Sequence, residues 1–464
     1  MSRKQHWLAL TVLVLLIIPA CQPYQTPTAR LTPRGTAEST TLEGTAMPDS
    51  QLGVAPDALR GVTIEAWHPW FGAEASLFES QVAEFNAGNP WGIQVHATGQ
   101  GNYAMLFDSV TAVLNLSNMQ PDMVIALPEH ALAWDEQEAV VNLNEYIHNP
   151  LWGLDQADID DFPGIFWAQD EIGDRQVGLP AQRSARFLLY NQTWARELGF
   201  DDPPATFTEF YEQACRANQA MRSDTTSKND NTGGWFMDAD PMTVLAWMQA
   251  FGGGVLEQGN YRFLTPDNIA AFQSLKVMYD SGCAWQSNET TRFEAFARRA
   301  ALFATADLAE LPDQARAFSS AGNADEWTVL SFPGPEKQGV VIYGSSYIML
   351  KSTDLEQLAA WLFIRWMLSP QEQTRWILST GLFPTRTSSL ASLKEYRSGH
   401  PQWAEAIELV SQGQLQPQLA SWQLVKIILG DGFNYIFRYN QPAGRVAAIL
   451  ADLDRTVSGM IKEK

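Results

Sequence analysis

The sequence predicts an α/β fold built on a parallel β-sheet, because strand-like runs alternate with helical patterns in its first folded part. The strand-like runs are VTIEAW (residues 62–67), GIQVHA (92–97) and PDMVIAL (121–127). A helical pattern with Phe78, Val82 and Phe85 at spacings of four and three lies between the first two, and a second spans residues 103–116. Strands that alternate with helices in this order form a parallel sheet, and the continuous apolar third run suits a strand buried on both faces.

Residues typical of helix starts recur further along the chain. Residues 206–209 (TFTE) and 369–372 (SPQE) have the form of a capping box, and Thr265 with Pro266 has the form of an N-cap followed by a first-turn proline. Each precedes apolar residues on one stripe. The apolar segment 355–368 contains Arg365, so we expect it to be a helix of the folded domain and not a membrane span.

The composition indicates a folded protein that does not bind nucleic acid. Hydrophobic residues make up 45% of the chain and 17 residues are tryptophan, which excludes a disordered chain. The formal net charge of −21 makes nucleic acid an improbable partner, because phosphate binding needs clustered Lys and Arg. The length is sufficient for two domains.

The N-terminus predicts export and a lipid anchor. Arg3 and Lys4 precede an apolar run over residues 7–18 that is too short to cross a bilayer, so residues 1–20 are interpreted as a signal peptide. Residues 18–21 (IPAC) resemble a bacterial lipobox, which implies lipidation at Cys21; an ordinary signal peptide and a membrane anchor are the alternatives. Residues 21–60 are rich in Thr, Pro, Ser and Gly without apolar periodicity, so we expect a flexible linker.

Two cysteines remain once Cys21 is assigned to lipid. Cys215 and Cys283 form either a disulfide, which export favours, or two buried free thiols. The six histidines are scattered, and no His/Cys spacing predicts zinc. Residues 154–161 (LDQADIDD) and 228–234 (KNDNTGG) lack the spacing of an EF-hand loop, so solvated turns are expected there, and we predict neither a metal nor a cofactor.

The chain from residue 61 onward resembles the extracytoplasmic solute-binding proteins of ABC importers, family 1, the sugar-type group that includes maltose-binding protein. Several motifs in order carry the resemblance. They are FNAGNPWGIQV (85–95), QPDMVIA (120–126), GLPAQRSARFLLYNQTWARELGFDDPPATFTEF (178–210), FPGP (332–335), YGSSYIML (343–350), AAWLFIRWMLSPQEQ (359–373) and GLFPTR (381–386).

The resemblance implies a two-lobed, type II periplasmic-binding-protein-like α/β fold with discontinuous lobes and a multi-strand hinge. Residues 61–182 and 346–412 would form lobe I, and residues 183–345 and 413–464 lobe II. The chain would cross near residues 181–185, 344–347 and 412–417. Ligand-dependent closure of such a hinge would signal to a permease.

The expected cleft suits a sugar, whose ring has apolar faces and a rim of hydroxyls. Tryptophans would stack on the ring and polar side chains would bond the hydroxyls. Some candidates lie at the C-terminal end of the first predicted strand, where open α/β sheets bind ligands. The other candidates are implied by the resemblance to the family. The candidate ligand-binding residues are Trp67, His68, Trp70, Glu129, Gln182, Arg183, Ser184, Trp235, Tyr343, Ser345, Tyr347 and Trp422.

Each candidate also has a structural interpretation. The tryptophans can pack in the core, the residues around Gly344 can serve ordinary strand packing, and Glu129 and His130 can lie in a solvated loop. Arg183 is either a bidentate clamp for a carboxylate or phosphate, or the partner of an acidic neighbour. The chain also departs from its relatives, since Asp307-Leu308 stands where many have a stacking aromatic.

The predicted function is that of a monomeric, lipid-anchored receptor on the extracytoplasmic face of the membrane, which delivers a mono- or oligosaccharide to an ABC importer permease. The alternatives are a receptor for a polyol phosphate or other small anion, and a tethered ligand sensor. No G-x-S-x-G, HExxH, P-loop or GxGxxG motif in the required setting supports an enzyme.

Overall fold

The structure, a computed structural model, describes residues 52–114, 116 and 120–462. All of these belong to one compact unit, Leu42–Lys464. The predicted signal peptide, Cys21 and residues 21–51 of the predicted linker lie outside the described residues. Among the helices that are described, none is both long and apolar enough to cross a bilayer.

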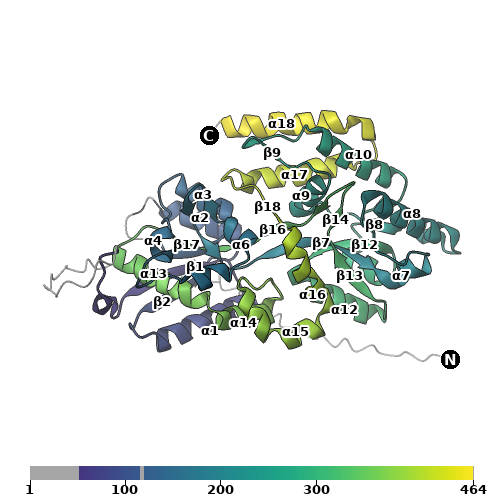
Figure 1. Ribbon diagram of the computed structural model, residues 1–464. Coiled ribbons are helices and arrows are strands. Elements are labelled where there is room, and N and C mark those ends of the chain that lie inside the picture. Colours follow the sequence, from purple (N-terminus) through teal and green to yellow (C-terminus); the bar gives the residue numbers. More distant parts are fainter. Residues whose placement is uncertain (1–51, 115, 117–119, 463–464) are drawn as a thin grey trace, which may run out of the picture. The chain divides into compact units, whose positions relative to one another are not determined.

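The first sheet confirms the three predicted strands and adds two from later in the chain (Figure 1). In spatial order its strands are β2 (Gln94–Gly99), β1 (Thr63–His68), β3 (Met123–Ala126), β17 (Ser346–Met349) and β6 (Leu179–Pro180). β1 pairs in parallel with both β2 and β3, as expected. β17 runs antiparallel to β3 and β6 antiparallel to β17, so the sheet is mixed.

Helices cover this sheet, among them those predicted around residues 78–85, 103–116 and 355–368. The helices of this region are α1 (Gly72–Gly88), α2 (Tyr103–Val113), α3 (Pro128–Asp135), α4 (Asn144–Ile147), α5 (Gln156–Asp160), α6 (Gly164–Ala168), α13 (Asp354–Met367) and α14 (Pro370–Thr380). Phe78, Val82 and Phe85 of α1 are buried in one core with much of α13. We call this sheet and its core lobe I.

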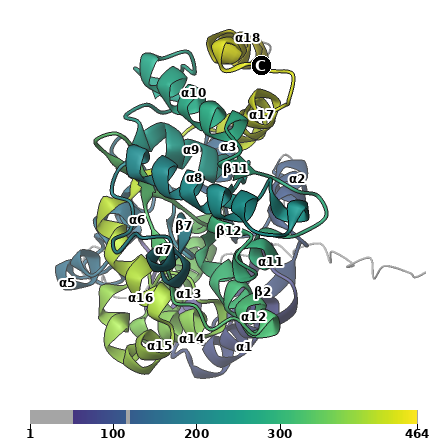
Figure 2. The same cartoon turned by 90° about the vertical axis from the view of Figure 1, so that its right-hand side faces the viewer.

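The second sheet is larger and also mixed. Its strands follow the order β11 (Ala284–Trp285), β8 (Gly233–Phe236), β12 (Ala301–Asp307), β7 (Ser184–Asn191), β16 (Val341–Tyr343) and β18 (Gln414–Leu415), and β13 (Trp327–Leu330) also pairs with β7. Its helices are α7 (Gln192–Glu197), α8 (Phe207–Ser223), α9 (Pro241–Ala250), α10 (Pro266–Asp280), α11 (Arg292–Ala297), α12 (Leu311–Ala321), α15 (Lys394–Gly399), α16 (Pro401–Glu408), α17 (Trp422–Ile436) and α18 (Val446–Lys462). We call this part lobe II; Figure 2 shows α10, α17 and α18 lying together on it.

Short elements complete the described chain. The 3-10 helices are η1 (Pro56–Leu59), η2 (Ser227–Asn229), η3 (Leu308–Glu310), η4 (Thr387–Ser392), η5 (Leu409–Gln412) and η6 (Ala443–Arg445). The small hairpins are β4 (Glu171–Ile172) with β5 (Arg175–Gln176), β9 (Leu256–Glu257) with β10 (Asn260–Tyr261), and β14 (Phe332–Pro333) with β15 (Gln338–Gly339).

Two of the three predicted helix starts form as expected. Thr206 and Glu209 make a reciprocal capping box at α8, and the Thr265 hydroxyl caps α10. At α14 only half of the box forms. Ser369 accepts from the backbone of Glu372, but the Glu372 carboxylate instead accepts from the side chains of Gln81 on α1 and Arg375 on α14 itself.

The chain crosses between lobes first from β6 to β7 and again from β16 to β17, within the ranges expected for the first two crossings. Gly344 makes the second crossing possible, since a Cβ there would lie 2.1 Å from the carbonyl oxygen of Gln182, and its φ is +152°. We call residues 181–184 and 343–346 the hinge segments. Their backbones are joined by hydrogen bonds from Ala181 and Gln182 to the carbonyl of Ser345.

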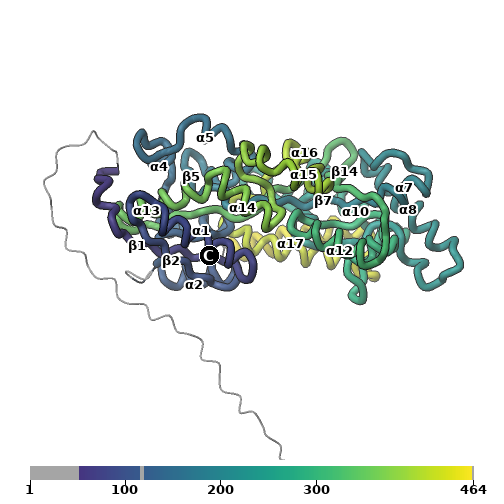
Figure 3. Tube along the Cα trace, turned by 90° about the horizontal axis from the view of Figure 1, so that it is seen from below, coloured from purple at the N-terminus to yellow at the C-terminus, as the bar shows by residue number. Residues whose placement is uncertain are grey.

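The third crossing differs from the prediction of residues 412–417. Trp376 of α14 packs in the lobe I core, whereas Leu382 and Phe383 pack with strands of lobe II, and Phe383 donates to the carbonyl of Arg183. α16 then buries Trp403 against lobe II. The chain therefore reaches the lobe II core at the end of α14, at Leu382 and Phe383, while Arg386 and Ser388 still bond Asp161 next to α5 of lobe I. Figure 3 follows this passage through α13, α14, α15 and α16.

The predicted linker also ends earlier than residue 60. Leu59 of η1 is fully buried in the lobe I core, and Leu52 and Val54 pack against it. These apolar residues are isolated in a polar stretch and show no periodicity, so the predicted start of the fold was too late.

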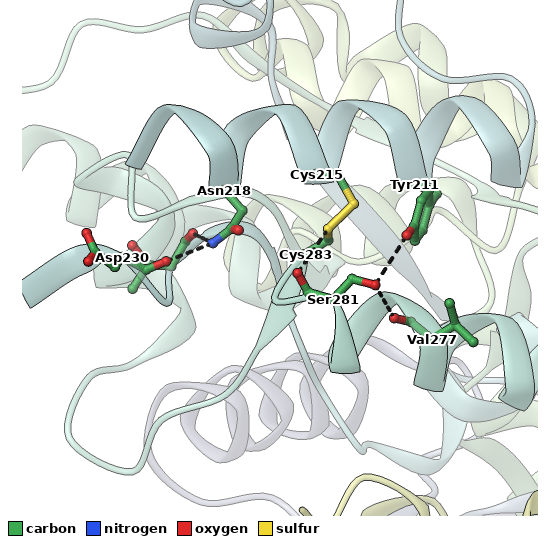
Figure 4. Close-up of a disulfide and its surroundings, with 8 residues drawn as sticks. Tyr211, Cys215, Asn218, Asp230, Val277, Ser281 and Cys283 are labelled. Atoms are coloured by element: carbon green, nitrogen blue, oxygen red, sulfur yellow. Dashed lines mark hydrogen bonds between the residues drawn. A yellow bond between two sulfur atoms is a disulfide. The ribbon is translucent and has the colours of Figure 1, made fainter. Parts of the chain in front are cut away.

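Cys215 and Cys283 form a disulfide, which resolves the alternative of two free thiols. It joins α8 to the chain entering β11, and Figure 4 shows the Tyr211 hydroxyl bonding Ser281 beside it. The two cysteines are 68 residues apart in the sequence, and the chain-entropy model gives about 4 kcal/mol of stabilisation for closing a loop of this length.

Candidate functional site

Polar side chains from both lobes meet at the hinge segments. In lobe I, Glu74 and Tyr103 lie near the starts of helices that follow β1 and β2. In lobe II, Asp238 and Asp307 stand where β8 and β12 end. Ligands of open α/β sheets bind at the carboxyl ends of strands, so both lobes present their binding edges to the same place.

Gln182 links the hinge to lobe I. Its Oε1 accepts from the Tyr103 hydroxyl at 3.1 Å and from the Ser345 hydroxyl at 3.2 Å, while its Nε2 donates to Glu74 Oε1 at 3.3 Å. Burial raises the pKa of Glu74, and burial raises the pKa of Tyr103 to about 12. Glu74 and Tyr103 stay partly exposed, so hydroxyl and carboxyl groups are presented beside the predicted Gln182 and Ser345.

The lobe II side carries four carboxylates, those of Asp238, Asp240, Asp307 and Glu310, which we call the carboxylate wall. Arg186 of β7 lies among them, with nitrogen-to-oxygen distances of 2.7 Å to Glu310, 3.0 Å to Asp240 and 3.5 Å to Asp238. Arg292 is a second partner of Glu310. Four carboxylates therefore face two guanidinium groups, which leaves an excess of negative charge.

The two best-buried aspartates of the wall have pKa values shifted in opposite directions. Burial opposes ionisation of Asp238, but Arg186 and hydrogen bonds from the backbone of Asp240 and the hydroxyl of Thr305 outweigh it and lower the pKa. Burial and the charge of Glu310 raise the pKa of Asp307.

Tyr343 and Ser184 link the hinge to lobe II. The Tyr343 hydroxyl donates to Asp307 Oδ2 at 3.2 Å, and the Ser184 hydroxyl accepts from the backbone of Leu308 at 3.4 Å. Burial, with the charge of Asp307, raises the pKa of Tyr343. Both predicted residues thus lie beside the carboxylate wall, and Asp307 occupies the place where relatives were expected to have an aromatic.

Glu129 pairs with a residue of the opposite lobe. Its carboxylate is buried at the start of α3 and lies 2.5 Å from Lys426 Nζ on α17, so the solvated-loop interpretation is wrong. His130 beside it is also buried, and burial lowers its pKa to about 4. Glu129 Oε2 and His130 Nδ1 are buried and have no hydrogen-bond partner among the residues that the structure describes.

Four predicted contact residues pack in the core instead. Trp235 lies on a strand buried on both faces and contacts Phe210 and Trp247. Trp422 is fully buried, and its indole donates to Gln416 at 3.0 Å. Trp67 and Tyr347 are buried in lobe I. Trp235 and Trp422 have no exposed surface, and Trp67 and Tyr347 keep only 9% and 2% of theirs.

Trp70 and His68 are also buried, although they lie at the predicted end of β1. The Trp70 ring packs on Trp376 with centroids 4.6 Å apart, and its backbone N–H donates to His68 Nδ1 at 3.3 Å. Burial lowers the pKa of His68 to about 4, so the ring is neutral at physiological pH. The next residue, Phe71, is 78% exposed.

Arg183 does not act as an anion clamp. Its guanidinium is fully buried, 2.6 Å from Asp170, and it donates to the carbonyls of Gln182, Ser345 and Phe166. These contacts tie the two hinge segments together. The interpretation as a partner of an acidic neighbour is therefore confirmed.

Sequence reasoning missed several residues of the site. They are Phe71, Glu74, Tyr103, Arg186, Asp238, Asp240, Glu310 and Lys426. Phe71 could have been found because it follows directly after the predicted Trp70, and Asp238 because it lies three residues after the predicted Trp235. The part of the chain that the structure describes contains no group of three His, Cys, Asp or Glu placed to hold a metal ion.

Comparisons with known proteins agree with this geometry. A family model described as bacterial extracellular solute-binding protein matches residues 80–409. No curated protein matches the chain in sequence.

Solved structures of binding proteins share the fold. The sugar-binding protein MalE of Xanthomonas citri is 19% identical with a TM-score of 0.72, over 87% of this chain and 98% of that one. The cyclic α-maltosyl-1,6-maltose binding protein of Arthrobacter globiformis is 19% identical with a TM-score of 0.70, over 86% and 99%. UgpB of Mycobacterium tuberculosis in complex with glycerophosphocholine is 18% identical with a TM-score of 0.68, over 86% and 98%.

Proposed function

Because the chain belongs to the bacterial extracellular solute-binding protein family, we propose that it captures a mono- or oligosaccharide between its lobes and delivers it to an ABC importer permease. The observation that carries this proposal is the convergence of polar side chains of both lobes on the hinge. Gln182 bonds Tyr103 and Glu74 of lobe I, and Tyr343 bonds Asp307 of lobe II. A ligand that touches both sets favours the closed state over the open one.

The chemistry of the site favours hydroxyl groups over an anion. Carboxylates, an amide oxygen and tyrosine hydroxyls accept hydrogen bonds from sugar hydroxyls, and Arg186 can donate to ring or glycosidic oxygens. The carboxylate wall repels a phosphate, and Arg183, which motivated the anion alternative, is fully engaged in the hinge. Two of the similar structures are sugar-binding proteins, and the complex of UgpB with glycerophosphocholine keeps the alternative worth testing.

We further propose that Cys21 carries the lipid anchor and that residues up to Leu52 tether the body to the outer face of the cell membrane. Several acyl chains, each worth about 0.8 kcal/mol per buried CH₂, hold a protein on a membrane much better than one chain. Closure is then the signal to the permease. A ligand needs about 5.5 kcal/mol of differential affinity to move a 1:99 mixture of closed and open states to 99:1.

Thermal shift against a ligand panel tests the proposal. Maltose, maltotriose, cyclic maltosyl-maltose, glycerol 3-phosphate and glycerophosphocholine are suitable members. At about 100 times its dissociation constant a ligand adds about 2.7 kcal/mol to the stability of the folded protein. We expect a sugar to raise the transition temperature and both phosphates to leave it unchanged.

The opposite result, in which a phosphate shifts the transition and no sugar does, would retire the carbohydrate proposal. Chromatography of the incubated sugars provides a second check. Appearance of shorter saccharides would identify a hydrolase instead of a receptor.

A further inference from the structure

A cavity lies in lobe I, away from the hinge. It has a volume of about 430 Å³ and is lined by Phe85, Trp91, Leu151, Trp152, Arg365 and Trp366, among others; we call it the outer pocket. Trp91 stands just before the N-terminal end of β2. The hinge-facing residues follow the C-terminal end of the parallel strand β1, so the outer pocket lies at the opposite end of the sheet.

Aromatic side chains from three separate segments form the walls of the outer pocket. Trp91 and Trp152 meet edge to face with ring centroids 6.1 Å apart, and Trp366 of α13 lies 5.7 Å from Phe85 of α1. Trp91 and Trp366 are partly exposed, and Leu151 beside them is 50% exposed. Partly exposed indoles around a concave, apolar space suit a flat ring.

Arg365 supplies a positive charge that has no carboxylate partner among the residues described by the structure. Its one hydrogen bond there goes from Nη1 to the carbonyl of Trp152, at 3.1 Å. The nearby carboxylate of Glu84 is already held by Arg375 through two contacts of 2.7 and 2.8 Å. The guanidinium therefore keeps donors that can bind a carboxylate bidentately.

Trp152 offers a further donor. This side chain is 4% exposed, it lines the outer pocket, and its indole N–H has no hydrogen-bond partner among the described residues. Because buried polar groups are normally paired, a ligand in the outer pocket can supply the acceptor that this indole lacks.

We propose that the outer pocket binds a flat, apolar organic anion of the aromatic carboxylate class, with its ring among the indoles of Trp91, Trp152 and Trp366 and its carboxylate on Arg365. This site is separate from the interlobe site, so one molecule of protein holds both ligands at once. In a chain of net charge −21, an unpaired guanidinium within an aromatic cavity provides the local attraction that such an anion requires.

Calorimetric titration with naphthalene-2-carboxylate tests the proposal, with neutral naphthalene-2-carboxamide as the paired probe. We expect one saturable site for the carboxylate. Its affinity should fall at least about tenfold in Arg365→Gln, because charge-assisted hydrogen bonds are lost. The carboxamide should bind at least about tenfold more weakly than the carboxylate, and Arg365→Gln should not change its affinity.

Arg445→Gln is the matched control, since Arg445 is exposed on lobe II and has no ion-pair partner among the described residues. It should bind naphthalene-2-carboxylate like the unaltered protein, and Trp366→Leu should bind it weakly. Both arginines are exposed, so neither substitution threatens folding, and the transition temperature verifies this. Absence of saturable binding below about 1 mM, or equal binding by Arg365→Gln and Arg445→Gln, would overturn the proposal. Competition by a sugar that binds the interlobe site would also overturn it.

Discussion

Arg183 and Arg186 are separated by two residues, yet they serve two different regions of the molecule. Arg183 lies in the hinge, where one carboxylate and three backbone carbonyls enclose it completely. Arg186 lies on the carboxylate wall, where three carboxylates surround it and its partner Asp240 keeps 34% of its side chain exposed. The first arginine fixes backbone segments, whereas the second balances charges that a ligand can reach.

Because both side chains are buried, with Arg183 0% and Arg186 5% exposed, the type of partner and not burial separates the structural arginine from the one at the candidate binding site. Backbone carbonyls cannot move away from Arg183 without moving the hinge itself. Carboxylate side chains around Arg186 can exchange one hydrogen bond for another when a ligand arrives. Substitutions at the two sites should therefore change different measured quantities.

Arg183→Met should have the largest effect on stability. It leaves the carboxylate of Asp170 buried without its cation, and breaking a buried pair in this way costs about 3–5 kcal/mol of the free energy of unfolding. Urea denaturation followed by tryptophan fluorescence measures the change. Arg196→Met, which removes an exposed ion pair with Glu326, should leave the midpoint unchanged.

A double variant separates the charge from the packing. Burial raises the pKa of Asp170, and Arg183 and the Ser346 hydroxyl oppose that shift. Asp170→Asn together with Arg183→Met leaves no unpaired carboxylate, so it should be more stable than Arg183→Met alone. Equal midpoints for Arg183→Met and Arg196→Met would show that the hinge pair has no structural role.

Asp240→Asn should have a smaller effect, and on ligand affinity instead of folding. Losing a charged hydrogen-bond acceptor costs about 1.5–3 kcal/mol, which is a fall in sugar affinity of about 10- to 100-fold. Calorimetry with the sugar found by thermal shift measures it. Glu326→Gln is the control, because Glu326 is exposed and pairs with Arg196, which is not part of the carboxylate wall. Unchanged affinity in Asp240→Asn would remove the wall from the ligand site.

Most of the fold could be predicted because local signals determine it. Apolar spacing located α1 and α13, strand-like runs between helical patterns located β1 to β3, and Thr206 with Glu209 marked the start of α8. The third crossing could not be located in this way. α14 and α16 carry similar apolar stripes, and only tertiary packing decides that Trp376 belongs to lobe I and Trp403 to lobe II.

The candidate site was predictable at the hinge and unpredictable in the lobes. Gln182, Ser184 and Ser345 lie where the crossing strands converge, and the resemblance to solute-binding proteins indicated these positions. Aromatic side chains gave no such information, because a tryptophan at a strand end fits a core or a cleft equally well. The pairing of Glu129 with Lys426, 297 residues apart, leaves no trace in the local sequence.

The smallest predicted effect compares two aspartates within the wall. Arg186 and local hydrogen bonds overcome burial and lower the pKa of Asp238, whereas burial and Glu310 raise the pKa of Asp307. A raised pKa means that the folded protein binds the proton more tightly than the unfolded chain. The contribution of Asp307 to the free energy of unfolding therefore falls as pH rises from the ordinary pKa of aspartate through the raised pKa. The contribution of Asp238 changes in the opposite direction, because it rises with pH from the lowered pKa up to the ordinary value.

Asp307→Asn removes only the falling contribution. Asparagine caps a helix as well as aspartate does, because its Oδ1 can still accept from the backbone of Glu310. Its Nδ2 takes the place of Asp307 Oδ2 and can donate to the hydroxyl oxygen of Tyr343, so that contact is kept with its direction reversed. Urea denaturation at several pH values from about 4 to about 7 should show the variant gaining stability relative to the unaltered protein as pH rises. Asp238→Asn should show the opposite slope at the acid end. If the difference in free energy of unfolding between Asp307→Asn and the unaltered protein were constant with pH, burial and Glu310 would not raise the pKa of Asp307. The two aspartates would then not differ in the way described.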